Sequence, residues 1–93
     1  MHGYTHDKDD IARRLGRIEG QVRGINRMVE DDTYCIDVLT QISAVTKALQ
    51  TVGLKLVEGH VGHCVVEAAA SSEEEGRAKV AEATSAISRL LRV

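Results

Sequence analysis

The sequence predicts an all-α fold of three helices, and three observations indicate it. The chain of 93 residues contains no proline, the residue that most strongly breaks helices. Its apolar side chains recur every three or four residues, the spacing of helices that bury one face. Polar breaks at residues 30–33 and 71–75 divide the chain into three. We therefore expect one domain over residues 1–93, with a flexible tail at residues 1–8 and no strand.

The first helix, expected over about residues 9–29, carries a heptad seam. Its apolar positions, which follow one another at alternating steps of four and three as in helices that pack along other helices, are Ile11, Leu15, Ile18, Val22, Ile25 and Val29. A second stripe consists of Gly16, Gly20 and Gly24, each of which costs the helix about 1 kcal/mol relative to alanine. We expect a close neighbour against this stripe, a packed helix rather than a DNA backbone.

A long second helix is expected from Tyr34 to about Ala69, and a third begins after it. The main buried face of the second helix is predicted to hold Cys35, Leu39, Ile42, Leu49, Val52 and Leu56. Glycines at 59 and 62 indicate a kink late in this helix. Ser72 and Glu75 fit a capping box that begins the third helix. Its inward positions are predicted to be Val80, Ala83, Ile87 and either Leu90 or Leu91.

Composition indicates a globular protein that associates with copies of itself. Apolar residues make up 43% of the chain and charged residues 28%. A chain this short buries little surface alone, and oligomerisation is a common remedy. There is no apolar run of membrane-spanning length, and the N-terminus has no apolar signal segment. We therefore expect a cytoplasmic homo-oligomer with no membrane association, in which the two cysteines stay reduced.

The charge distribution is more informative than the net charge of −2. Residues 13–27 contain five arginines against one acidic residue, Glu19, whereas residues 67–75 contain four glutamates and no base. A basic stripe on one helix is the electrostatic pattern of a nucleic-acid-binding surface, which the near-neutral total conceals.

Three residues with soft donor atoms form the candidate chemical site. His60 and Cys64 are four apart on a predicted helix, so their side chains share one face and can hold one metal ion. By itself this pair is a weak signal, since a half-buried histidine beside a buried thiol is the more common reading. Cys35 lies on the same helix, on the order of 37 Å from His60 at the helical rise of 1.5 Å per residue.

One straight helix cannot bring these three residues together, but two antiparallel copies can. If Cys35 of one chain meets His60 and Cys64 of the other, the twofold axis crosses the helix near residues 47–49, where the small Ala44 and Ala48 allow close approach. Two thiolates and one imidazole form a soft set of three donors, which favours Cu(I). Zinc prefers four ligands, so it would need His63, an N-terminal histidine or water.

Three stretches resemble one bacterial family. They are residues 14–24 (RLGRIEGQVRG), residues 34–44 (YCIDVLTQISA) and residues 60–64 (HVGHC). Together they resemble the copper-sensitive operon repressors, the CsoR/RcnR-like metal-sensing transcriptional repressors, over nearly the whole chain. The resemblance implies a three-helix protomer, an antiparallel four-helix-bundle dimer and a tetramer of two dimers. It also implies Cu(I) ligation by Cys35, His60 and Cys64 across the dimer interface, with Tyr34 and Glu82 as supporting partners.

The resemblance further implies a function in transcription. The metal-free protein is expected to bind operator DNA, and Cu(I) is expected to release it and derepress copper-resistance genes. The residues that the family implies for DNA contact are Arg14, Arg17, Arg23 and Lys47, with Arg13 and Lys55 behind them. The chain departs from some members where they have an extra basic residue late in the second helix, at Thr51 or Leu54 here.

Other functions stay open at this point. In the nickel and cobalt branch an additional N-terminal histidine binds the metal, and that position falls on Gly3 here, between His2 and His6. A persulfide or thiol sensor would use the two cysteines without His60. A helical interaction protein without a DNA role is a further alternative. An enzyme with a small-molecule substrate is not expected, because no general base accompanies the soft donors.

Overall fold

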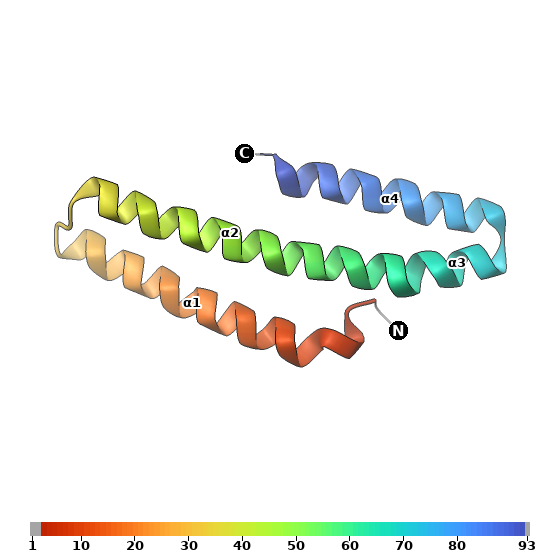
Figure 1. Cartoon of the computed structure of the whole chain (residues 1–93), viewed down its shortest axis with the longest axis horizontal. Coiled ribbons are helices and arrows are strands. Elements are labelled where there is room, and N and C mark those ends of the chain that lie inside the picture. The colour runs from red at the N-terminus through yellow and green to blue at the C-terminus, as the bar shows by residue number, and fades with distance from the viewer. Residues whose placement is uncertain (1–2, 93) are drawn as a thin grey trace.

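The structure is a computed structural model that describes residues 3–92, and it is helical throughout (Figure 1). A short 3₁₀ turn, η1 (Thr5–Asp7), leads into α1 (Lys8–Glu30). The next helix is α2 (Cys35–Gly59), which continues through a π-helical segment, η2 (His60–Val65), into α3 (Val66–Ser71). The chain ends with α4 (Glu73–Leu91). Within residues 3–92 there is no strand, and the predicted all-α fold is confirmed.

The segments α2, η2 and α3 form one continuous rod over residues 35–71. The residues at both junctions have right-handed helical backbone angles, including Gly59 and His60 at the first and Val65 and Val66 at the second. The kink expected near residues 59–62 is therefore a wider π turn that does not break the rod. Such turns inside α-helices occur frequently at functional sites. The three predicted helices correspond to α1, the rod and α4.

Both predicted breaks are present, and each has a local cause. After α1, Asp32 adopts a left-handed backbone conformation (φ 56°), which aspartate tolerates better than most residues. The amide of the next residue, Thr33, donates a hydrogen bond to the carbonyl of Met28 at 2.9 Å. Between α3 and α4, Ser72 is extended and its Oγ accepts a hydrogen bond from the amide of Glu75 at 3.1 Å. Ser72 is thus the N-cap that the sequence predicts.

The helix α1, the rod and the helix α4 lie side by side in a single layer. In Figure 1, α1 runs along the first part of the long rod on one side, and α4 folds back along its later part on the other. The molecule measures 57 × 27 × 13 Å. Its shortest dimension is close to the diameter of a single helix with its side chains, about 10–12 Å. Both faces of the layer are therefore uncovered in the single chain.

The buried core joins α1 to α2 and is small. Ile11, Ile18, Val45 and Val52 are buried, and Ile25 and Ala48 pack against them. The three isoleucines of this core occupy every second position of the seam predicted for α1. On the other side, Ala83 is buried and Leu90 packs onto the open backbone of Gly53. Leu90 is therefore the inward residue of α4, and Leu91 is exposed.

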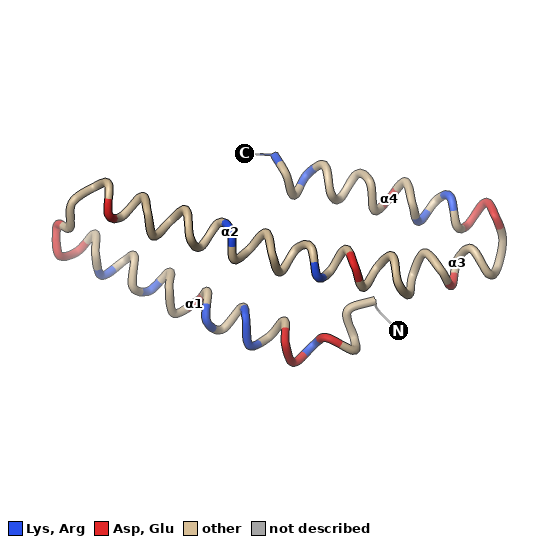
Figure 2. Tube along the Cα trace, viewed as in Figure 1, with Lys and Arg blue, Asp and Glu red and all other residues tan. Residues whose placement is uncertain are grey.

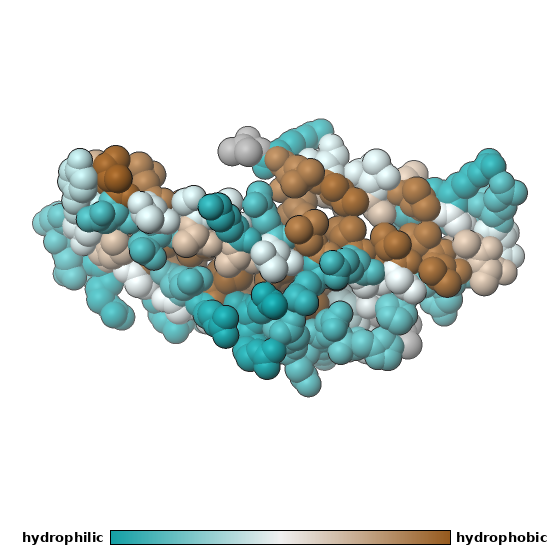
Figure 3. Space-filling view, in the orientation of Figure 1, coloured by the Kyte–Doolittle hydropathy of each residue, from teal (hydrophilic) through white to brown (hydrophobic). Residues whose placement is uncertain are grey.

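Many residues predicted to be buried are exposed in the single chain, so the prediction of their burial is wrong for one protomer. Leu39, Ile42, Leu49 and Leu56 are 38–56% exposed, because α1 covers only one side of α2. The exposed positions elsewhere are Leu15, Val22 and Val29 on α1 and Val80 on α4. Figure 3 shows apolar surface spread over the rod and α4. No helix of the described chain is both long and apolar enough to traverse a bilayer.

The glycine stripe of α1 has no close neighbour among residues 3–92, contrary to expectation. A Cβ at Gly16 or Gly24 would meet nothing within 4 Å, and one at Gly20 would meet only the side chain of Arg23, at 3.7 Å. The reason is the orientation of α1, which turns its isoleucines toward α2 and this stripe outward.

Two glycine substitutions test the packing of α3 against α4. A Cβ at Gly76 would lie 2.9 Å from the backbone Cα of Ala69, so Gly76→Ala is expected to destabilise the protein by roughly 1–3 kcal/mol. Gly24→Ala meets open space and should stabilise it by about 0.5–1 kcal/mol through helix propensity. Urea denaturation at a fixed protein concentration measures both. Equal effects would contradict the close approach at Gly76.

Candidate metal centre

The π turn places His60 and Cys64 at one cavity. Both residues are half-buried and line a cavity of about 290 Å³ between the rod, α4 and the N-terminal segment. Its other lining residues are Gly3, Tyr4, Leu56, Val57, Glu82, Ala83 and Ala86. An imidazole and a thiol therefore line the same, mostly apolar space.

His60 also contacts α4. Its Nε2 lies 3.4 Å from the main-chain carbonyl oxygen of Lys79. A carbonyl only accepts, so this contact requires the proton on Nε2, which leaves the Nδ1 lone pair for a metal. A hydrogen bond of this kind orients an imidazole ligand and fixes its tautomer. Sequence reasoning missed the Lys79 carbonyl, because a main-chain acceptor leaves no signature in residue type.

Cys35 is not near this pair. It is the exposed first residue of α2, and the described chain contains no group of three His, Cys, Asp or Glu residues that could hold a metal. Along a continuous rod, Cys35 and His60 lie on the order of 37 Å apart at the helical rise. A single chain thus assembles two of the three predicted ligands.

The two supporting residues are divided in the same way. Glu82 lines the cavity, and its carboxylate lies 3.6 Å from the ammonium of Lys79. Tyr34 is exposed at the other end of the rod, beside Cys35, and its carbonyl accepts hydrogen bonds from the amides of Asp37 and Val38. Each end of the rod therefore carries part of the predicted set.

The N-terminal segment takes part in the cavity, where the sequence suggested a flexible tail over residues 1–8. Gly3 is buried, Gly3 and Tyr4 line the cavity, and residues 5–7 form η1. The imidazole rings of His6 and His63 lie 5.0 Å apart, inclined at 38°. No sequence pattern predicted these contacts, because they join residues more than 50 positions apart. His2 lies outside the described residues.

Three of the predicted DNA-contacting residues converge on one carboxylate. Asp10 pairs with Arg13 at 2.6 Å, with Arg14 at 3.0 Å and with Lys55 at 3.4 Å. Hydrogen bonds from Arg14 and then Arg13 lower the pKa of Asp10 from 3.8 to about 2. Asp10 therefore holds basic groups of α1 and α2 beside each other while neutralising part of their charge.

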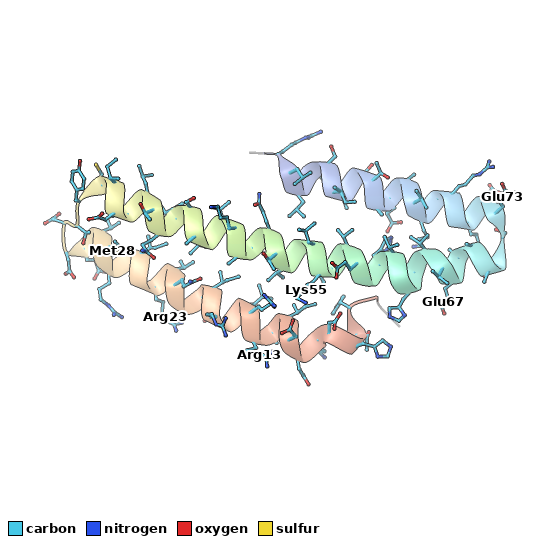
Figure 4. All side chains as sticks on the ribbon, in the orientation of Figure 1. Arg13, Arg23, Met28, Lys55, Glu67 and Glu73 are labelled. Carbon is cyan, nitrogen blue, oxygen red and sulfur yellow. The ribbon has the colours of Figure 1, made fainter. Side chains whose placement is uncertain are left out.

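The remaining basic candidates form fewer ion pairs. Arg23 pairs with Glu19 at 3.3 Å, whereas Arg17 and Lys47 are exposed and form no ion pair within residues 3–92. Figure 2 shows basic residues along much of α1, and Figure 4 shows Arg13 and Arg23 on its outer side. A pocket of about 200 Å³ between α1 and α2 is lined by Arg14, Arg17, Ile18, Gln21, Ala48 and Thr51. The basic surface thus follows α1 and reaches α2.

Comparison with known families decides what class of protein this is. The family described as metal-sensitive transcriptional repressors matches residues 7–89. The chain belongs to this family. A curated relative, the copper-sensing transcriptional repressor RicR of Mycobacterium tuberculosis (strain H37Rv), is 59% identical over 91 residues, which cover 98% of this chain and 95% of that protein. The copper-sensing repressor CsoR of Bacillus subtilis (strain 168) is 54% identical and covers 80% of this chain and 73% of its own.

Solved structures of similar repressors share the fold. The copper-sensing repressor CsoR with Cu(I) from Geobacillus thermodenitrificans NG80-2 superposes with a TM-score of 0.83 at 44% identity, covering 95% of this chain and 90% of that one. The nickel-responsive transcriptional regulator InrS superposes with a TM-score of 0.74 at 36% identity, covering 89% and 91%. The resemblance drawn from the three sequence stretches is confirmed.

The pKa of Asp10 tests whether Arg13, Arg14 and Lys55 gather around its carboxylate. The pKa of Asp10 is lower in the folded state than its ordinary value, so its stabilising effect is present above pH 3.8 and is lost as the pH falls toward about 2. Asp10→Asn should therefore lower the melting temperature near neutral pH and lose that difference in acid. A carboxyl titration by NMR measures the pKa directly. An ordinary value near 4 would contradict the cluster.

Proposed function

We propose that this chain is a Cu(I)-responsive transcriptional repressor. In this proposal, the metal-free protein binds operator DNA, and Cu(I) bound by Cys35, His60 and Cys64 releases it and derepresses copper-resistance genes. The observation that carries the proposal is the soft pair His60 and Cys64 in one cavity, in a chain that belongs to a metal-sensitive repressor family. The 44% identical neighbour that contains Cu(I) supports the choice of metal.

An antiparallel dimer would complete the site. The rod separates Cys35 from His60, so a partner running the other way would bring its Cys35 to the pair and leave an equivalent site at the opposite end. The exposed leucines and isoleucines of α2 support this arrangement, because they form an apolar face that the rest of the described chain leaves uncovered. We propose that two such dimers form a tetramer, as the resemblance implies.

The donor set fits Cu(I). Thiolates are soft ligands that select Cu(I), and two of them with one imidazole make a three-coordinate set. The carboxylate of Glu82 lines the same cavity and would accept a hydrogen bond rather than bind a soft ion. When bound, Cu(I) would supply the bonds that join one subunit's Cys35 to the other's His60 and Cys64.

Operator binding would rest on the basic surface of α1 and α2. We propose that Arg17 and Lys47 contact phosphates directly, because they are exposed and form no ion pair with any residue in the range 3–92. Arg13, Arg14, Arg23 and Lys55 would contribute charge around them. We propose that the outward glycine stripe of α1, where no described residue packs closely, would let a DNA backbone approach. We further propose that the protein works in the cytoplasm, where this DNA is, and without catalysis.

Coupling between the two sites would pass through α4. His60 contacts the Lys79 carbonyl of α4, so a change in the orientation of His60 would act on that helix, where Glu82 pairs with Lys79 and lines the same cavity. We propose that metal ligation shifts α4 in this way and moves the basic residues out of register with DNA. Because binding free energies are linked, DNA must weaken copper binding by the same factor.

Nickel is the second candidate inducer, since the nickel-responsive regulator InrS shares the fold at 36% identity. The nickel branch places an N-terminal histidine at the position of Gly3, which here has no side chain. A persulfide response is the third, and His60→Ala separates it: the response to copper should disappear while a response of the two thiols survives. Release of operator DNA by Ni(II) but not by Cu(I) would favour the nickel alternative.

Mixed oligomers test whether the site is shared between subunits. Cys35→Ala and the double variant His60→Ala/Cys64→Ala should each lose tight Cu(I) binding. When the two are unfolded together and refolded as a mixture, heterodimers should regain one of their two sites, because one chain supplies Cys35 and the other supplies the pair. Anaerobic competition with a Cu(I) chelator measures the recovered sites.

The control is each variant unfolded and refolded alone, which should recover no sites. If the mixture binds no more Cu(I) than the separate variants, the cross-subunit site is wrong. If Cys35→Ala alone binds as tightly as the wild type, Cys35 is not a ligand.

A second experiment tests the DNA surface. Arg17→Ala should weaken operator binding across sequences and reduce the salt slope of log K by about one, as expected when one phosphate contact is lost. Arg89→Ala is the matched control, because Arg89 is an exposed arginine without an ion pair within the described chain but lies on α4, across the rod from α1. Fluorescence anisotropy over a salt series measures both. Equal losses would contradict the assignment of α1.

A further inference from the structure

The N-terminal segment is fixed to the rod by a contact between two glycines. Gly3 and Gly59 are both buried, and their backbones meet directly. A Cβ on Gly59 would lie 2.6 Å from the carbonyl oxygen of Gly3, and a Cβ on Gly3 would overlap the carbonyl of Gly59. Neither backbone can yield as a flexible side chain would, so only glycine at both positions permits this approach.

A second contact fixes the same segment one turn further along the rod. The ring of His6 lies against the ring of His63, with 5.0 Å between their centres. Between the two contacts, the amide of Asp7 donates to the carbonyl of Tyr4 at 2.9 Å and closes the turn η1. The segment therefore meets the rod at two points and is folded between them.

These two contacts lie beside the two proposed ligands. Gly59 immediately precedes His60, and His63 immediately precedes Cys64. Gly3 and Tyr4 line the cavity that holds the ligand pair, together with Glu82 and Ala83 of α4. The segment thus closes one wall of the cavity, over the stretch of chain that carries both ligands.

We propose that residues 3–7 form a cap over the metal cavity and that Gly3 and Gly59 are its positioning residues. The cap limits the access of dissolved thiols and chelators to Cys64, and so slows the loss of bound Cu(I) to them. Exchange of a thiolate ligand requires an incoming donor to reach the metal, and the cap occupies one path of approach. The statement about copper rests on the proposed function, whereas the statement about Cys64 does not.

Alkylation of the metal-free protein tests the cap directly. Iodoacetamide should modify Cys64 at least about fivefold faster in Gly59→Ala than in the wild type, because the reactive fraction follows local opening of the segment. Gly62→Ala is the matched control, since it adds the same methyl group three residues further along the rod, inside the π turn, but meets nothing within 4 Å. Mass spectrometry separates the two cysteines, so the rate is measured at Cys64 alone.

Gly3→Ala keeps the test decisive if Gly59→Ala disturbs the rod, because it breaks the same contact from the segment's side. It should accelerate alkylation of Cys64 to a similar extent while the helical content by circular dichroism stays that of the wild type. Equal rates at Cys64 in the wild type and in folded Gly59→Ala and Gly3→Ala would overturn the cap.

The copper part is measured separately, as the rate at which the Cu(I)-loaded protein releases its metal to an excess of chelator. Release should be several times faster in Gly59→Ala and Gly3→Ala than in Gly62→Ala and the wild type. If alkylation accelerates but the wild type binds no Cu(I), the proposed function fails and the cap over Cys64 stands. If Cu(I) binds normally and neither rate changes, the cap fails and the proposed function stands.

Discussion

The length of one uninterrupted helical rod is the constraint on which the rest of the structure depends. Residues 35–71 continue from α2 through the π turn into α3, so Cys35 and the pair His60–Cys64 are held far apart. The same rod supplies the surface on which α1 and α4 pack, one on each side (Figure 1). A kink sharp enough to fold the rod back would bring the three donors together in one chain, but the backbone stays helical across it. The rigidity of the rod is therefore what makes a second copy necessary to the proposed site.

The single-layer arrangement adds a second reason for association. A layer little more than one helix thick buries four side chains in its α1–α2 core and leaves a row of leucines and isoleucines on α2 exposed. Apolar burial contributes about 25 cal/mol per Å², so covering this face would be a large part of the stability of the folded protein. Metal binding and stability would then depend on the same interface. The π turn connects the parts of the proposed site. It carries His60 and Cys64, contacts the N-terminal segment, and contacts α4 through His60.

Sequence reasoning reached the helices and the chemistry, and its errors have a common physical origin. The N-cap at Ser72 and the break at residues 30–33 follow from local rules, and the structure confirms both. Periodicity identified the apolar faces, but it cannot tell whether a face is covered by the same chain or by another, so Leu39 and Leu49 were placed in a core that one chain does not form. The spacing of His60 and Cys64 predicted that they share one helix face, whereas the cavity that both line was not predicted. The contacts of Gly3, His6 and the Lys79 carbonyl join distant segments through backbone or ring packing, which no local pattern encodes.

We propose that Cu(I) bound across subunits controls operator binding. The most direct measurement is an anaerobic titration of operator DNA with the wild type and with Cys35→Ala, each with and without one Cu(I) per protomer. We expect copper to release the wild type from DNA, and Cys35→Ala to bind DNA equally well with and without copper. Release of both proteins by copper would contradict the role of Cys35, and a wild type that stays bound to DNA with copper would contradict the claim itself.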